Sequence, residues 1–200
     1  MIQILNPRVA TVLFLGFSSG LPLALSGGTL QAWLTVEDVD IKTIGLFSLV
    51  GLPYTLKFLW SPLMDRFVVP IFGRRRGWIA LSQLTLIGLI LGMSITSPQN
   101  GLWFLALLAF CLTFVSASQD VAIDAYRTEV LRERERGIGA AVSVTGYRVA
   151  MLVSGALALI LSEYLGWRVT YMLMALIMSI GVVSVWLGPN PRTLELLPPQ

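Results

Sequence analysis

Six long apolar stretches occupy most of the chain, and they constrain its fold more than any other feature. Each stretch is 19 to 25 residues long. At a helical rise of about 1.5 Å per residue, that length crosses a hydrocarbon core of roughly 30 Å. The predicted spans are residues 9–33, 43–64, 78–96, 102–126, 138–161 and 167–187, and residues 191–200 are a tail or the start of a linker. The sequence therefore predicts an all-α membrane protein with six transmembrane helices.

The composition supports the same class and excludes several others. Hydrophobic residues make up 56% of the chain and charged residues 12%, with a mean hydropathy of +0.78, which is too apolar for a soluble domain of this size. The net charge of +3 comes from basic residues in short loops, so we expect no nucleic-acid partner. The chain has no histidine and a single cysteine, Cys111, inside an apolar run. We therefore expect no metal, no cofactor and no disulfide.

The basic residues of the loops predict the orientation of the protein in the membrane. Ten arginines fall on one side of a six-span arrangement: Arg8, Arg66, Arg74, Arg75, Arg76, Arg127, Arg132, Arg134, Arg136 and Arg192. The opposite loops carry only Lys42 and Arg168 as basic residues, so the positive-inside rule places both termini in the cytoplasm. The first span is expected to be a retained helix, and Pro22 is expected to kink it.

Four charged side chains lie inside the predicted spans and form the candidate functional site. Asp120 and Asp124 share one helical face with Thr113, Ser116 and Ala117, and Gln119 borders that face. Counted from the arginine-rich boundary, Asp120 lies about 10 Å deep and Asp124 about 5 Å deep. Lys57 lies at a depth similar to that of Asp120, and Arg148, about 15 Å deep, is long enough to bend back toward Asp120. Charges inside a membrane are costly and mark functional sites, so we assign proton coupling to the aspartates and a substrate or charge-network role to the cations.

Other interpretations of these residues remain open. Asp124 can pair with Arg127 in the headgroup region, Lys57 can extend to the membrane surface, and Asp120 can belong to a structural ion pair. The aromatic residues nearby can stack on a sugar ring or serve as interfacial anchors; they are Trp33, Tyr54, Trp60 and Tyr147. In an isolated half of a transporter, we expect an open side lined by groups among Gln31, Trp60, Gln119 and Asp120.

Two loop motifs resemble cytoplasmic signatures of the major facilitator superfamily. The first contains Asp65 and Arg66, followed after an extra stretch by Gly73, Arg74, Arg75 and Arg76. The second contains Glu129, followed by Arg136 and Gly137. The resemblance implies gating roles for these residues. It also implies that the six spans form two inverted three-helix repeats, the N-terminal domain of such a transporter.

A closer resemblance covers nearly the whole chain. The runs that carry it are GLPLALSGGTLQAW at 20–33, KTIGLFSLVG at 42–51, KFLWSPLMDR at 57–66, FGRRRGW at 72–78, SASQD at 116–120, GYR at 146–148 and MLVSG at 151–155. They resemble the AmpG muropeptide permease family. The resemblance implies proton-driven import of anhydromuropeptides, which are GlcNAc-1,6-anhydro-MurNAc units with or without a peptide, across the bacterial inner membrane. Asp120 and Asp124 match positions regarded as essential in that family.

Three alternatives to this function follow from the same residues. Members of the family have about twelve helices or more. The six predicted here are expected to need a second six-helix half, or to form a truncated, non-transporting half or a membrane interaction partner. A transporter of another solute, such as an acyl-CoA, is the second alternative. An intramembrane aspartyl protease is disfavoured, because both aspartates lie on one helix and cannot enclose a peptide bond.

Overall fold

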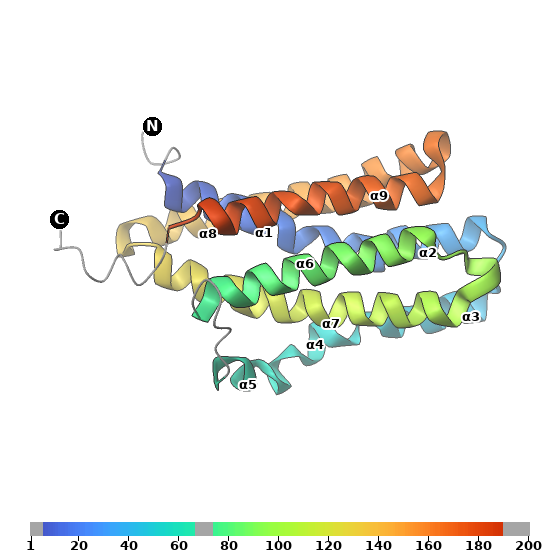
Figure 1. The fold of residues 1–200 in the computed structure, drawn as a ribbon, viewed down its shortest axis with the longest axis horizontal. Coiled ribbons are helices and arrows are strands. Elements are labelled where there is room, and N and C mark those ends of the chain that lie inside the picture. The colour runs from blue at the N-terminus through green and yellow to red at the C-terminus, as the bar shows by residue number, and fades with distance from the viewer. Residues whose placement is uncertain (1–5, 67–73, 190–200) are drawn as a thin grey trace.

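The computed structural model describes residues 6–66 and 74–189, and every regular element in these ranges is helical. The elements pack side by side as a bundle with one long axis (Figure 1). The first part of the chain contains α1 (Pro7–Ser26) and α2 (Gly28–Val36). The remaining long elements are α6 (Arg74–Ile95), α7 (Pro98–Val130), α8 (Arg136–Leu152) and α9 (Ala158–Leu187). A 3-10 turn at Glu133–Glu135 (η3) precedes α8, and a π-helical turn at Val153–Leu157 (η4) joins α8 to α9.

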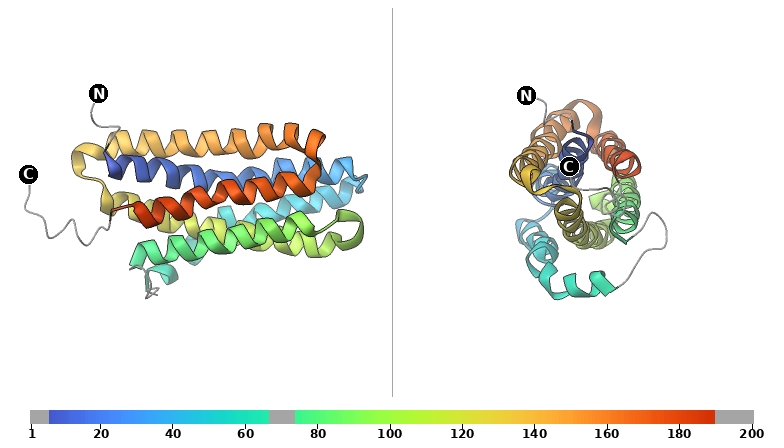
Figure 2. Two further views of the ribbon diagram at one scale, coloured as in Figure 1. Left: turned by 45° about the horizontal axis from the view of Figure 1, so that its top comes forward. Right: turned by 90° about the vertical axis from the view of Figure 1, so that its left-hand side faces the viewer.

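Four helical stretches are long and apolar enough to cross a membrane: Pro7–Val36, Arg75–Ile95, Pro98–Val130 and Glu133–Leu187. The last of these has 55 residues and reverses direction at Gly166, where φ is 76° and ψ is 162°. Only glycine adopts such a backbone conformation at little cost. The chain beyond Gly166 returns along the bundle, as the orange and red ribbon in Figure 2 shows. Predicted spans 138–161 and 167–187 thus correspond to the two arms of this helical hairpin.

The predicted span at 43–64 differs from the structure, because this segment is not one continuous helix. It consists of α3 (Ile41–Phe47), η1 (Ser48–Gly51), α4 (Leu52–Leu56), η2 (Lys57–Leu59) and α5 (Ser61–Arg66), where η1 and η2 are 3-10 turns. Pro53 and Pro62 explain two of the breaks, since proline lacks an N–H and clashes with the carbonyl four residues earlier. The segment packs mainly along α7 and lies at the edge of the bundle (Figure 2).

The first span is interrupted at one of its glycines and not at the proline that was expected to kink it. The interruption lies at Gly27, with φ −100° and ψ −112°, whereas Pro22 stays inside α1. The Ser26 hydroxyl donates to the carbonyl of Pro22 at 2.8 Å. The backbone leaves helical geometry at Gly27, and this separates α1 from α2 within one stretch that is long enough to span the membrane.

Glycines bring α1 and α8 into backbone contact. A Cβ added at Gly16 would collide with the carbonyl of Ser143, and one at Gly20 would collide with the carbonyl of Tyr147. On the facing helix, a Cβ at Gly146 would collide with the carbonyl of Leu13. Small residues spaced four apart are how membrane helices approach closely. This contact fixes the position of Tyr147 and its neighbours relative to α1.

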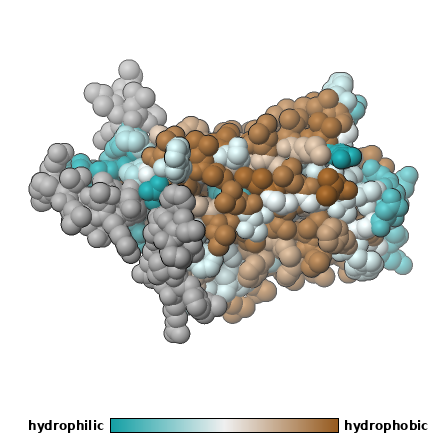
Figure 3. Space-filling model, in the orientation of Figure 1, coloured by the Kyte–Doolittle hydropathy of each residue, from teal (hydrophilic) through white to brown (hydrophobic). Residues whose placement is uncertain are grey.

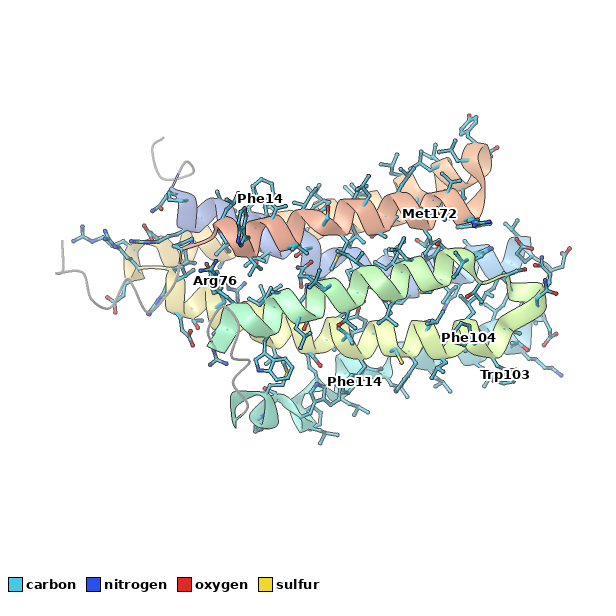
Figure 4. The ribbon with its side chains drawn as sticks, in the orientation of Figure 1. Phe14, Arg76, Trp103, Phe104, Phe114 and Met172 are labelled. Atoms are coloured by element: carbon cyan, nitrogen blue, oxygen red, sulfur yellow. The ribbon has the colours of Figure 1, made fainter. Side chains whose placement is uncertain are left out.

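The surface is apolar around the middle of the bundle and polar at its two ends (Figure 3). Large apolar side chains that point outward from α7 include Trp103 at 77% exposure and Phe104 at 55%, and Figure 4 labels both. Exposed apolar area of this extent is unusual in water and expected in lipid. The protein is a multi-pass membrane protein.

Candidate functional site

Asp120 is the most enclosed of the four predicted intramembrane charges. It lies on α7, and its side chain is 12% exposed. Its Oδ1 atom accepts a hydrogen bond from the Ser19 hydroxyl on α1, and its Oδ2 atom lies 3.8 Å from the Lys57 Nζ. The Lys57 side chain is 37% exposed, so the ion pair joins an enclosed carboxylate to a more accessible amine.

A cavity of about 400 Å³ opens beside this ion pair. Its walls come from α1, α7 and α8 together with Lys57. The lining residues are Gly16, Ser19, Lys57, Asp120, Ile123, Asp124, Arg127, Ser143, Val144, Tyr147, Arg148 and Met151. On α7 the lining runs from Asp120 toward the arginine-rich end, and on α8 it runs from Ser143 to Met151. All four predicted intramembrane charges line the cavity.

The four charges are not joined in one network, however. Asp124 forms its ion pair with Arg127, 3.1 Å away on the same helix, as one of the open interpretations stated. Asp124 is 58% exposed, in contrast to Asp120. Arg148 lines the cavity and is exposed, and in the described part of the chain it forms no ion pair with either aspartate. Its side chain thus leaves a positive charge on the cavity wall.

The expected open side holds for Asp120 but not for Gln119. Gln119 is fully buried, and neither of its amide atoms has a hydrogen-bond partner among the described residues. Successive residues on a helix point about 100° apart, so Gln119 is directed into the packed side while Asp120 faces the cavity. Trp60 is half-buried: its Nε1 donates to the Ser118 hydroxyl at 3.0 Å and its ring packs on that of Phe114. Gln31 lies on α2, away from the lining of this cavity.

Ser19 is the site residue that the sequence analysis missed. It lies between Gly16 and Gly20, on the face of α1 that the glycines bring against α8. The sequence does contain an indication of this role, because a serine between glycines in an apolar helix can face a neighbouring helix. Nothing in the sequence alone indicated that its partner would be a carboxylate 101 residues away.

Comparison with known proteins decides the family. Residues 12–200 match the profile described as Major Facilitator Superfamily. The chain belongs to this superfamily. Its members are permeases, not enzymes, and this sets the aspartyl protease hypothesis aside. Membership also supports the predicted fold class, the N-terminal domain of such a transporter.

Individual relatives are similar over most of the chain. An anhydromuropeptide permease of Escherichia coli strain K12 is 55% identical over 187 residues, which are 93% of this chain and 38% of that protein. An uncharacterized protein of Haemophilus influenzae is 39% identical over 95% of the chain and 45% of its own length. A putative transporter AmpG 4 of Rickettsia felis is 34% identical, covering 89% and 44%. The chain thus spans less than half the length of these relatives. The predicted resemblance to the AmpG permease family is confirmed.

The superfamily loop motifs lie together at the arginine-rich end. Arg75 forms an ion pair with Glu129, 2.9 Å apart, and so joins the two predicted loops. The Arg76 guanidinium donates to the carbonyls of Val185 and Trp186, where α9 ends (Figure 4). A cation at a helix C-terminus is stabilised by the helix dipole. Both arginines therefore tie the start of α6 to neighbouring helices.

The structure also places the other motif residues. Asp65 and Arg66 end α5 and Arg74 begins α6, while Gly73 lies outside the described residues. Arg136 and Gly137 begin α8 and are exposed. The neighbouring Glu135, which the sequence analysis did not select, is buried. It accepts from the Asn6 amide at 2.5 Å and lies 3.6 Å from Arg8.

Proposed function

We propose that this chain forms the N-terminal six-helix half of a transporter that imports anhydromuropeptides together with protons across the bacterial inner membrane. The observation that carries the proton coupling is Asp120, an enclosed carboxylate on a cavity wall that is paired with the Lys57 amine. The substrate class is supported by 55% identity to a protein named anhydromuropeptide permease. Both termini lie in the cytoplasm in this proposal, and the six spans form two inverted repeats.

Asp120 is well placed to couple a proton to the state of the cavity. When Asp120 is ionised, it holds Lys57 by charge attraction. Protonation removes this attraction and leaves the Lys57 amine with a positive charge and no counter-charge from Asp120. Lys57 and Arg148 then face the cavity as cations and attract the carboxylates of a bound peptide. Substrate binding is thereby favoured by the same event that loads the proton.

Release follows from the reverse sequence. A second six-helix half closes the cavity, and rocking of the two halves exposes it to either side of the membrane. On the cytoplasmic side, Asp120 loses its proton and attracts Lys57 again, which weakens the hold on the substrate. Asp124, paired with Arg127 nearer the arginine-rich end, lies on the path along which the proton leaves.

Uptake by the full-length transporter that carries this chain tests the proposal. Right-side-out vesicles with an imposed inward pH gradient should accumulate labelled anhydromuropeptide, and unlabelled anhydromuropeptide should compete. An acyl-CoA in excess should not compete, since the substrate class is proposed from the identity to an anhydromuropeptide permease and not from the cavity charges, which attract phosphates as well as carboxylates. If acyl-CoA blocked accumulation and unlabelled anhydromuropeptide did not, anhydromuropeptides would be rejected as the substrate class in favour of acyl-CoA. The 200-residue chain alone should bind without accumulating substrate, and full accumulation by it would remove the need for a second half.

A further inference from the structure

Gln83 carries a buried amide that the mechanism above does not use. It lies near the middle of α6 and is fully buried. An amide inside a membrane protein is costly unless it is hydrogen-bonded, and polar side chains of this kind commonly link one membrane helix to another. The Gln83 Nε2 atom donates to the Ser18 hydroxyl at 2.7 Å. Gln83 therefore joins α6 to α1 at a point deep inside the bundle.

The contact between Gln83 and Ser18 has a fixed direction. The Ser18 hydroxyl donates its own proton to the Leu15 carbonyl at 3.0 Å, so its oxygen serves as the acceptor for Gln83. The Gln83 Oε1 atom has no hydrogen-bond partner among the described residues, so the bond to Ser18 orients the amide. On its other side the amide packs against α9, where a Cβ added at Gly181 would collide with it. The amide thus holds this part of α1 from a position wedged between two helices.

The neighbour of Ser18 is Ser19, which donates to Asp120. Successive residues on a helix point about 100° apart, so the rotation of α1 that turns Ser18 toward α6 also turns Ser19 toward α7. A rotation of α1 that broke the bond from Gln83 would carry the Ser19 hydroxyl away from Asp120. Gln83 therefore sets the direction of Ser19.

The bond from Ser19 is the contribution of α1 to the surroundings of Asp120. The other groups that face Asp120 are charged or titratable: Tyr54 of α4, Lys57 of η2, Asp124 and Arg127 of α7, and Tyr147 and Arg148 of α8. From α1, the cavity lining receives Gly16 and Ser19, neither of which carries a charge. A donated hydrogen bond stabilises an ionised carboxylate more than the neutral acid. The position of α1 thus acts on the proton at Asp120 through one hydroxyl.

We propose that Gln83 is a positioning residue for the proton step: through Ser18 it holds α1 so that Ser19 donates to ionised Asp120, and it thereby sets the pH range of transport. The proposal rests on the proton coupling proposed above. Gln83 acts from a distance, since none of the residues that line the cavity lies on α6. Without Gln83 the Ser19 hydroxyl is released, and the protonated, substrate-binding form of the site persists to higher pH.

Counterflow exchange of labelled anhydromuropeptide by the full-length transporter tests this role. Exchange is measured at equal pH on both sides over a series of pH values, so that no gradient drives it and the pH of half-maximal exchange reports proton loading. Gln83→Met keeps the length of the side chain but removes the amide, and it should raise this pH by about one unit. Ser19→Ala should raise it by a similar amount. The double variant should shift it no further than Ser19→Ala alone, because Gln83 acts through Ser19.

Two further variants separate this role from a loss of stability. Tyr171→Phe is the matched control, because it removes another buried hydrogen bond to α1, from the Tyr171 hydroxyl to the Leu25 carbonyl at 3.0 Å. It should leave the pH of half-maximal exchange unchanged even where thermal stability falls. Ser18→Ala breaks the bond to Gln83 from the side of α1, and it should shift this pH as Gln83→Met does. It replaces Gln83→Met in the comparison if that variant fails to insert.

Three results would overturn the role of Gln83. The first is an unchanged pH of half-maximal exchange in both Gln83→Met and Ser18→Ala. The second is lower exchange at every pH with the same midpoint, since the bond would then serve stability alone. The third is an additive shift in the double variant with Ser19→Ala, because Gln83 would then act by a route other than Ser19. If Asp120→Asn kept the wild-type pH dependence of exchange, the proton coupling at Asp120 itself would be contradicted.

Discussion

At the scale of single residues, Glu135 shows how a charge can stabilise the arginine-rich end. Its carboxylate accepts from the Asn6 amide, from the Arg132 backbone N–H at 3.1 Å, and lies 3.6 Å from Arg8. The side chains of Arg8 and Glu135 are 13% and 12% exposed, so solvent screens this pair little. The contacts connect the start of α1 to the turn before α8.

We expect Glu135→Gln to lower the free energy of unfolding by about 1 to 3 kcal/mol, because a neutral amide weakens these charge-assisted bonds. Glu133→Gln, in the same turn but exposed, should change it by no more than about 0.5 kcal/mol. Thermal unfolding of the purified variants in detergent compares the two. Equal losses would mean that the buried contacts of Glu135 add nothing to stability.

The sequence predicted contacts between residues where only their depth in the membrane mattered. Lys57 and Asp120 were placed at similar depths by counting helical turns, and the structure pairs them at 3.8 Å. Counting could not decide the direction of a side chain about its helix, so Gln119 was expected at an open side and is buried. Nor could it show that Ser19 donates to Asp120, because that contact depends on how closely α1 approaches α7.

At the scale of elements, the close contact of α1 with α8 depends on glycine. Gly20→Ala should destabilise the protein by about 1 to 3 kcal/mol, because the added methyl meets the Tyr147 carbonyl and backbone cannot move aside cheaply. Gly88→Ala on α6 is the control. An added Cβ there meets nothing within 4 Å, and helix propensity should favour alanine by up to about 1 kcal/mol.

Thermal unfolding in detergent measures the stability of both glycine variants. Circular dichroism spectra recorded without ligand check that each variant keeps its helix content. If Gly20→Ala proved as stable as Gly88→Ala, the close approach of α1 to α8 would be wrong. The close approach of the two helices would then no longer explain why Tyr147 and Arg148 line the cavity.

Element boundaries followed from the sequence only where apolar length dominates. The long stretches that became α6 and α7 were found, although α7 extends from Pro98 to Val130, beyond the predicted 102–126. Residues 43–64 have the same apolar character, yet the structure divides them into short helices and turns. The two prolines, Pro53 and Pro62, are the sequence feature that indicates this division. An average of hydropathy over the whole segment does not register the loss of single backbone hydrogen bonds.

At the scale of the whole molecule, the orientation can be measured directly. In a Cys111→Ser background, Asn100→Cys should react with a membrane-impermeant maleimide added to intact spheroplasts. Glu133→Cys should react only after the membrane is opened, because it lies at the arginine-rich end that the positive-inside rule places in the cytoplasm. Both positions lie next to the ends of α7 and are exposed. The reverse labelling pattern would invert the proposed topology.

The central claim is that Asp120 couples proton movement to transport, and one comparison tests it most directly. Asparagine resembles protonated aspartic acid in shape but cannot change charge. In the full-length transporter, Asp120→Asn should therefore insert normally and keep counterflow exchange of labelled anhydromuropeptide. It should lose accumulation driven by a pH gradient, with a reduction of about 100-fold or more. Full gradient-driven accumulation by Asp120→Asn would contradict the account and leave Asp124 as the next carboxylate to test.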